Sequence, residues 1–246
     1  MKDRVALVTG GMGTIGTAII EALHAAGCKA IATFRYPGDP NADKWLAAMA
    51  AKGIPVTVAT CDVTDYHAVL KALDEVEAQT GPIDILVNAA GITRDNTLRK
   101  MSVEHWAEVI GTNLDSVFNC TQPLIEGMTE RGWGRIINIS SINGQKGQFG
   151  QANYSAAKAG MHGFTKAVAQ EVARKGVTVN TISPGYIDSP MINAVPEDIR
   201  EGIRKAIPVQ RFGKPSEIAR AVVFLADEES GFITGTDLSI NGGQYM

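Results

Sequence analysis

The sequence predicts an open α/β fold, in which helices cover both faces of one doubly wound parallel sheet. Short apolar runs alternate with longer amphipathic runs along the chain, which is the pattern of successive parallel βαβ units. The short runs are rich in β-branched residues and are apolar continuously or at alternate positions, as buried parallel strands are. The 246 residues contain no linker, repeat or low-complexity segment, so we expect a single domain over residues 1–246.

Taken in chain order, the strand candidates share this apolar, β-branched composition. They are VALVTG at 5–10, KAIATF at 29–34, PVTVAT at 55–60, IDILVN at 83–88, RIINIS at 135–140, VTVNTI at 177–182 and the short DLSI at 237–240. The helix candidates between them carry apolar residues at helical spacing. They occupy residues 17–27, 44–53, 67–81, 103–131 and 154–176.

Glycine and proline mark the ends of these elements. Four helix candidates stop at a glycine, the usual C-terminal signal, at positions 27, 53, 81 and 176. Pro123 lies inside the candidate at 103–131, where it predicts a kink or a new helix start. The segment RYPGDPN at 35–41 is expected to form a loop because of its Pro, Gly and Asn content.

Composition argues against several classes of protein. The net charge is −3 and no face or tail is strongly basic, so we expect no nucleic-acid partner. No apolar run is long enough to span a membrane, and the N-terminus lacks a signal-peptide pattern. The three cysteines are widely spaced, as reduced thiols of a cytoplasmic protein are. The four histidines show no metal-ligand spacing, so no metal site is expected.

A glycine-rich loop directly follows the first strand. TGGMGTIG, residues 9–16, places Gly11, Gly13 and Gly16 in G-x-G-x-x-G spacing before a helix. Such a loop lets the backbone approach a pyrophosphate and aims a helix N-terminus at its charge. A purely structural turn is the alternative, but the strand before and the helix after it favour dinucleotide binding and a Rossmann fold.

The end of the second strand bears on which nicotinamide cofactor binds. It reads TFRY, with Arg35 and no acid where a carboxylate for the ribose of NADH is expected. An arginine there can hold a 2′-phosphate, which favours NADPH. A solvated loop arginine is the alternative, and Asp39 and Asp43 nearby would weaken a phosphate site, so NADH remains possible.

Three polar residues suggest chemistry at a carbonyl group. Tyr154 and Lys158 are four residues apart in a helix candidate and therefore share a face. An ammonium beside the phenol would lower its pKa from about 10 and make it a better general acid at neutral pH. Ser140 ends a strand at the edge where open α/β sheets bind ligands, and its hydroxyl could donate to a carbonyl oxygen. Surface helices also carry such pairs, but their combination with the glycine loop favours a catalytic set.

Over essentially its whole length the chain resembles the short-chain dehydrogenase/reductase family. The resemblance rests on TGGMGTIG, Asp62 in CDV, NAAG at 88–91, Asn113, Ser140, Y-x-x-x-K at 154–158 and PGYI at 184–187. It implies that Tyr154 is the general acid, that Lys158 supports it and binds the nicotinamide ribose, that Ser140 polarises the carbonyl and that Asn113 anchors a water of the proton relay. It also implies a homotetramer.

The same resemblance implies the residues that contact the cofactor. They are Gly10, Met12, Gly13, Thr14, Ile15, Gly16, Arg35, Asp62, Val63, Asn88, Ala89, Ala90, Gly91, Tyr154, Lys158, Pro184, Gly185 and Ile187. Two positions depart from the family pattern. Thr14 replaces a glycine, which could shift the loop near the phosphates, and Ala89 replaces an asparagine, which removes a hydrogen bond that supports the sheet.

Residues 91–101, 131–155 and 183–187 resemble in particular the acetoacetyl-CoA reductases of polyhydroxybutyrate synthesis. This implies reduction of acetoacetyl-CoA to 3-hydroxybutyryl-CoA, with a helical lid at 188–208 over the substrate. The implied substrate contacts are Asp95, Gln148, Phe149, Gln151 and Tyr186; lid packing is the alternative for the two aromatic residues.

Two other functions remain open. One is a 3-oxoacyl-ACP reductase of fatty acid synthesis, which would use the same chemistry on another carrier. The basic residues that could bind either carrier are Arg94, Arg99, Lys100, Arg131 and Arg135. The other is a redox-sensing dinucleotide-binding protein without turnover. The complete set of Asn113, Ser140, Tyr154 and Lys158 argues against such a sensor, which needs no proton donor.

Overall fold

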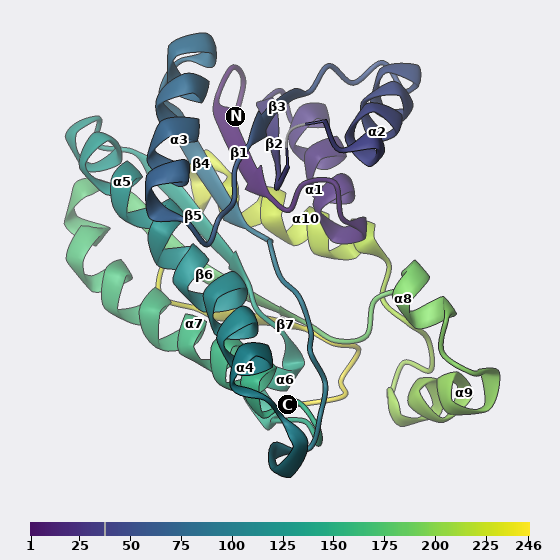
Figure 1. Cartoon of the computed structure of the whole chain (residues 1–246). Helices are drawn as coiled ribbons and strands as arrows, with labels where there is room; N and C mark the ends of the chain where they lie inside the picture. Colours follow the sequence, from purple (N-terminus) through teal and green to yellow (C-terminus); the bar gives the residue numbers. More distant parts are fainter. Residues whose placement is uncertain (37) are drawn as a thin grey trace.

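A seven-stranded parallel sheet forms the centre of the computed structural model, which describes residues 1–36 and 38–246 (Figure 1). The strand order is β3-β2-β1-β4-β5-β6-β7, and each neighbouring pair is parallel. The strands are β1 (Val5–Thr9), β2 (Lys29–Phe34), β3 (Thr57–Thr60), β4 (Ile83–Asn88), β5 (Gly134–Ile139), β6 (Val177–Pro184) and β7 (Asp237–Ile240). The predicted doubly wound Rossmann sheet is thereby confirmed, and its order reverses between β1 and β4, where such sheets bind ligands.

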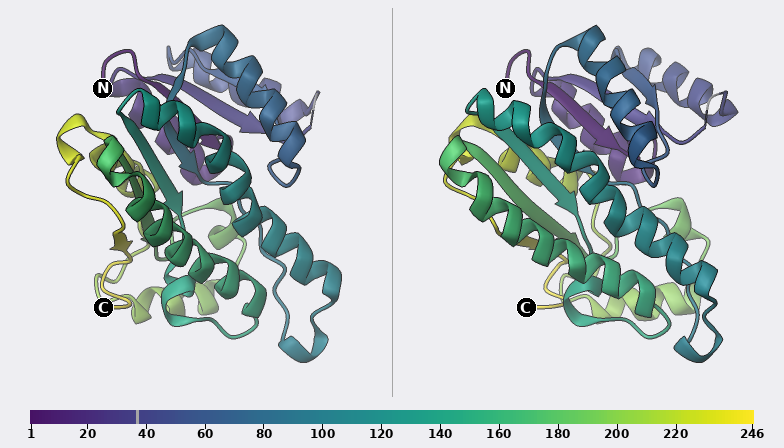
Figure 2. Two further views of the ribbon diagram at one scale, coloured as in Figure 1. Left: turned by 90° about the vertical axis from the view of Figure 1, so that its left-hand side faces the viewer. Right: turned by 60° about the vertical axis from the view of Figure 1, so that its left-hand side comes forward.

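Helices pack on both faces of this sheet (Figures 1 and 2). One face is covered by α1 (Thr14–Ala25) and α10 (Pro215–Ala226), whose buried side chains include Ile19, Leu23 and Val222. The opposite face is covered by α3 (Tyr66–Thr80), α5 (Ser116–Glu130) and α7 (Ala152–Val172). The remaining helices are α2 (Pro40–Ala51), α4 (Val103–Ile110), α6 (Ile142–Lys146), α8 (Pro190–Asn193) and α9 (Glu197–Ala206), with short 3₁₀ turns at Leu98–Lys100, Ala173–Lys175 and Glu228–Ser230.

Three details differ from the expectations. The helix α5 continues through Pro123, and the irregularity lies earlier, in a π-helical turn at Gly111–Asp115. The helix α2 begins inside the predicted loop at 35–41, where Asp39 caps it by accepting from the Asn41 N–H at 2.8 Å; residue 37 of that loop lies outside the described residues. The helix α10 was not predicted.

The carboxyl ends of the central strands place polar residues at one edge of the sheet. Thr9 is in register with Asn88, which is in register with Asn138. The Asn88 Nδ2 donates to Asn138 Oδ1 at 2.9 Å, and Thr9 Oγ1 accepts from the backbone N–H groups of Ala89 and Ala90. These bonds tie the loop after β4 to its neighbours, although Ala89 stands where the family resemblance implies an asparagine. Within the described part of the chain, no helix is both long and apolar enough to cross a bilayer.

Candidate active site

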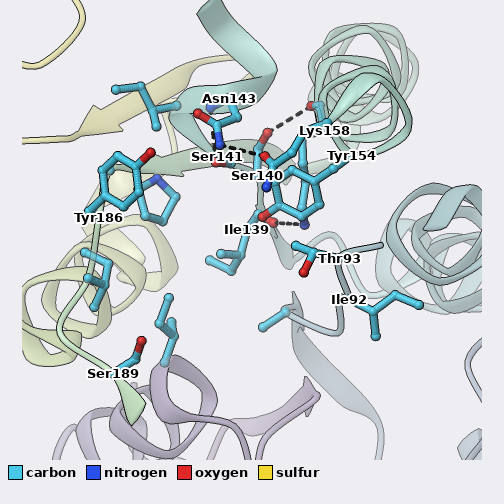
Figure 3. Close-up of a pocket in the computed structure, with 18 of the residues that line it drawn as sticks. Ile92, Thr93, Ile139, Ser140, Ser141, Asn143, Tyr154, Lys158, Tyr186 and Ser189 are labelled. Carbon is cyan, nitrogen blue, oxygen red and sulfur yellow. Dashed lines mark hydrogen bonds between the residues drawn. The ribbon is translucent and has the colours of Figure 1, made fainter. Parts of the chain in front are cut away.

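A pocket of about 290 Å³ lies beyond the carboxyl ends of β4, β5 and β6 (Figure 3). Its volume is near the lower end of the roughly 300–1,000 Å³ range of small-molecule sites. Residues that follow these strands line it together with residues of α7 and α8. The lining includes Ile92, Thr93, Ser140, Ser141, Asn143, Gln151, Tyr154, Lys158, Pro184, Gly185, Tyr186, Ile187, Ser189 and Ile192.

The helix α7 brings Tyr154 and Lys158 into this pocket, as their four-residue spacing predicted. The Lys158 ammonium lies 5.6 Å from the centroid of the Tyr154 ring and donates to the Ile139 carbonyl at 2.8 Å. Burial lowers the pKa of Lys158 to about 7. Burial also raises the pKa of Tyr154, against a smaller opposing effect of a hydrogen bond with Ser141. The pKa of the phenol is therefore raised and not lowered as the sequence predicted, because burial is the largest influence on it.

Ser140 lies directly after β5, beside Tyr154 and Lys158. Its side chain is buried, and its Oγ donates to the Lys158 carbonyl oxygen at 2.9 Å. Its backbone N–H donates to Ile182 O at 2.8 Å. In Figure 3, Ser140, Tyr154 and Lys158 converge on one wall of the pocket, and Tyr186 faces them across it. A carbonyl group bound between these walls could meet both the serine hydroxyl and the phenol.

Asn113 is fully buried in the π-helical turn and contacts the loop after β4. Its Oδ1 accepts from the Ile92 N–H and its Nδ2 donates to the Ile92 carbonyl, both at 2.9 Å. Glycine at position 91 allows this close approach, since a Cβ atom there would lie 2.6 Å from Asn113 Oδ1. The asparagine thus fixes the loop that borders Lys158 rather than lining the pocket itself.

The glycine loop has the close backbone packing expected of a phosphate-binding turn. Gly10 has a φ of +63°, and a Cβ atom there would lie 2.9 Å from the Ala90 Cα. A Cβ atom at Gly16 would lie 2.3 Å from the Gly10 carbonyl oxygen. Gly13 precedes α1 as its N-cap, and the exposed Thr14 is the first helical residue. The loop therefore presents open backbone at a helix N-terminus, which fits a pyrophosphate.

A second pocket continues from the first toward the ends of β2 and β3. Both pockets share Gly91 and Ile92, and the second is also lined by Gly10, Arg35, Asp62, Val63 and Ala90. The two together form an elongated site over the switch point of the sheet, which fits a dinucleotide. Of the predicted cofactor residues, Asn88 lies instead within the sheet, where it is 3% exposed.

Arg35 and Asp62 form an ion pair at the far end of this second pocket. The Arg35 Nε donates to Asp62 Oδ2 at 2.9 Å, and Asp62 Oδ1 accepts from the N–H and hydroxyl groups of Thr64. Burial alone would raise the pKa of Asp62, but the hydrogen bonds from Thr64 and Arg35 hold it below its usual value. The carboxylate therefore stays ionised and orients the guanidinium.

The predicted substrate residues divide into two groups. Gln151 and Tyr186 line the pocket, and Gln151 Nε2 donates to Asp95 Oδ2 at 2.8 Å, which connects Asp95 to the site. Gln148 and Phe149 lie on the loop between α6 and α7 and do not line the pocket. The Gln148 side chain accepts from Lys146, and Phe149 is 87% exposed.

Three residues near Ser140, Tyr154 and Lys158 were missed by the sequence analysis. Ser141 caps α6, Asn143 Nδ2 donates to Gln151 Oε1 at 2.9 Å, and His162 Nε2 lies 2.9 Å from Ser140 Oγ. His162 could have been found from the sequence, because it follows Lys158 by four residues and therefore shares its face of the helix. Among the described residues, no three His, Cys, Asp or Glu side chains gather as a metal site would require, and Cys28, Cys61 and Cys120 are free and buried.

Comparison with known proteins gives matches along the whole chain. A family model described as enoyl-(acyl carrier protein) reductase matches residues 11–244. The acetoacetyl-CoA reductases of Rhizobium meliloti and Allochromatium vinosum are 58% identical over 245 residues and 55% identical over 243 residues, and each alignment covers 99% of both chains. The 3-oxoacyl-[acyl-carrier-protein] reductase FabG of Escherichia coli is 44% identical over 245 residues, covering 100% of this chain and 98% of its own.

Proposed function

The chain belongs to the short-chain dehydrogenase/reductase family of oxidoreductases, and we propose that it reduces acetoacetyl-CoA to 3-hydroxybutyryl-CoA with NADPH. The observation that carries the proposal is that Ser140, Tyr154 and Lys158 line one pocket. The 58% identical acetoacetyl-CoA reductase supports the substrate. In polyhydroxybutyrate synthesis, such a reaction supplies the 3-hydroxybutyryl unit.

The residues present fit a dinucleotide phosphate cofactor. Gly10, Gly13 and Gly16 leave the backbone open at the N-terminus of α1, where the pyrophosphate would bind. Arg35 would hold the 2′-phosphate through its Nη groups, since its Nε is engaged by Asp62. When bound, the cofactor supplies the hydride that reduces the C3 carbonyl carbon of the substrate.

The side chains of the pocket supply the remaining steps. Ser140 donates its hydroxyl hydrogen to the carbonyl oxygen as negative charge develops there. Tyr154 gives its proton to the same oxygen and so completes the alcohol. Asn113 would hold a water of the proton relay through its main-chain carbonyl, because both polar atoms of its side chain bind Ile92.

The carrier is proposed to be coenzyme A because few free basic residues border the site. Arg131 donates to the Ile83 carbonyl and the buried Arg135 to Gly134 O, so both lie at the opposite edge of the sheet. Arg94 pairs with Glu108 at 2.8 Å. Of the five candidates, this leaves Arg99 and Lys100, on a short 3₁₀ turn, to attract an acidic carrier protein.

We also propose a single domain with a lid and a homotetrameric, cytoplasmic protein. Ser189 and Ile192 of the segment 188–208 line the pocket, which supports its role as a lid. Exposed Phe118 on α5 and Phe232 before β7 supply apolar surface that an oligomer would cover. Light scattering of the purified protein measures the oligomer directly.

The carrier and the cofactor are tested in one assay. We expect kcat/KM with NADPH to be higher for acetoacetyl-CoA than for acetoacetyl-ACP at physiological salt. The same assay with NADH measures the cofactor preference. Higher kcat/KM for the ACP substrate, falling steeply as salt rises, would contradict the proposal and favour fatty acid synthesis. Binding of NADPH without turnover of any 3-oxoacyl thioester would indicate a redox sensor.

A further inference from the structure

A buried chain of polar side chains extends from Ser140 away from the substrate. His162, one turn after Lys158 on α7, places its Nε2 2.9 Å from Ser140 Oγ. The same nitrogen lies 3.3 Å from Ser183 Oγ and 3.4 Å from Asp237 Oδ2. His162 and Asp237 are only 15% and 18% exposed in their side chains. The arrangement therefore connects the ends of β5, β6 and β7 behind the catalytic serine.

The hydrogen-bond partners of His162 determine which nitrogen of its ring carries the hydrogen. Ser183 donates its only hydroxyl hydrogen to Asp237 Oδ1 at 2.6 Å, so its oxygen can only accept from the imidazole. The Asp237 carboxylate is also an acceptor, and it is held by Gln145 Nε2 at 2.8 Å. Because two acceptors face Nε2, this nitrogen must be the protonated one.

The consequence for Ser140 follows from its single hydrogen. A serine hydroxyl has one hydrogen and two lone pairs. If Nε2 were unprotonated, it would accept the Ser140 hydrogen and compete with the substrate for it. When the His162 Nε2–H donates to Ser140 Oγ, the Ser140 hydrogen stays available for another acceptor. In the structure it is donated to the Lys158 carbonyl oxygen at 2.9 Å, and a substrate oxygen would be the alternative acceptor. Releasing Lys158 O costs little, since a carbonyl within a helix also accepts from residue i+4.

We propose that His162 is a positioning residue for Ser140, which it holds through a hydrogen bond from Nε2–H, while Asp237 fixes the imidazole in that tautomer. This inference rests on the proposed carbonyl reduction. The arrangement differs from a Ser-His-Asp hydrolase triad, in which the aspartate binds Nδ1 and leaves Nε2 to take the serine proton. Here the serine and the aspartate share Nε2, so Ser140 is held as a donor and is not activated as a nucleophile.

The charges around the ring are consistent with a neutral imidazole. Burial lowers the pKa of His162, and the neighbouring Lys166 and Lys158 act in the same direction. Asp237 opposes them. A neutral ring has one hydrogen to place, and the geometry assigns it to Nε2.

Steady-state kinetics of two variants test the role of this hydrogen bond. H162L removes the donor, and H162Q retains an amide N–H at nearly the same distance from the backbone. Loss of one neutral hydrogen bond predicts that H162L lowers kcat about three- to tenfold, with KM for NADPH unchanged, and that H162Q restores at least half of the wild-type kcat. H67L is the matched control, because His67 is exposed and far from the pocket. Equal kcat in H162L and wild type, or no rescue by H162Q, would overturn the proposal.

The tautomer itself is measured on the wild-type protein, so the proposal does not depend on the folding of a variant. In ¹⁵N NMR spectra, with the His162 signals assigned by their loss in H162Q, we expect a protonated-type shift for Nε2 and an unprotonated-type shift for Nδ1. The reverse pattern would refute the positioning role even if the enzyme is active. Absence of any 3-oxoacyl thioester reduction by wild type would refute the proposed function instead, and the NMR result would still decide the tautomer.

Discussion

At the scale of single residues, burial sets the pKa values of Tyr154 and Lys158 more than their spacing does. Sequence spacing correctly predicted that Tyr154 and Lys158 face one pocket. It could not predict the depth of that pocket, which raises the pKa of the phenol and lowers that of the ammonium to about 7. Desolvation depends on which distant segments of the folded chain surround the two side chains, and their four-residue spacing does not specify this.

The acid role of Tyr154 is tested by Tyr154→Phe. The change keeps the ring and removes the transferable proton, so kcat should fall about 10²–10⁴-fold, while the dissociation constant for NADPH stays within a factor of about three of the wild-type value. Steady-state kinetics and cofactor fluorescence titration measure the two quantities. Tyr245→Phe makes the same change at an exposed residue and should leave both unchanged. A variant that retained a third of the wild-type kcat would exclude Tyr154 as the acid.

The cofactor role of Arg35 is tested by Arg35→Ala. Loss of a charge-assisted hydrogen bond to the 2′-phosphate should raise KM for NADPH roughly ten- to hundredfold and change KM for NADH little. Arg174→Ala, at an exposed arginine on the 3₁₀ turn after α7, serves as the control for charge alone. Equal increases with both cofactors would indicate stacking on the adenine, and a wild-type preference for NADH would refute the assignment.

At the scale of elements, the regular strands and helices were predictable and the irregular turn was not. The nearly continuous apolar pattern of β1 and β4 and the alternating apolar pattern of β6 predicted strands that the structure buries throughout. The π-helical turn at Gly111–Asp115 has no local signature, because it depends on the pairing of Asn113 with Ile92 from another segment. Pro123 was a misleading signal, since α5 continues through it. The helix α10 had a readable pattern, with Ile218, Val222 and Leu225 at helical spacing.

The contact between this turn and the loop after β4 is tested by Gly91→Ala. The added methyl group would lie 2.6 Å from Asn113 Oδ1, so either the loop or the asparagine must move. Overpacking of this kind costs about 1–3 kcal/mol, and we expect a lower melting temperature together with a lower kcat. Gly163→Ala, on α7 with no atom within 4 Å of its added Cβ, should instead be neutral or stabilising. A Gly91→Ala protein with wild-type stability and activity would contradict the proposed role of the turn.

At the scale of the whole molecule, the sheet could be predicted from the sequence. The contacts of His162 with Ser140, Ser183 and Asp237 could not. The alternation of strands and helices implies parallel neighbouring strands, which the observed pairings confirm. Asp237 was identified only as part of a short strand candidate. Its approach to His162 becomes visible once β7 is known to pair with β6 in register, with Asp237 beside Thr181.

The position of Asp237 near the end of the chain has a consequence for the order of events during synthesis. A ribosome adding about 5–20 residues per second needs roughly 5–20 s to extend the chain from Ser140 to Asp237. The strands β1 to β6 can pair during that time, because all of them precede residue 185. The imidazole of His162 gains its carboxylate partner only when β7 emerges and docks on β6. We therefore expect the paired strands β1 to β6 to form during synthesis before the contact between His162 and Asp237 does.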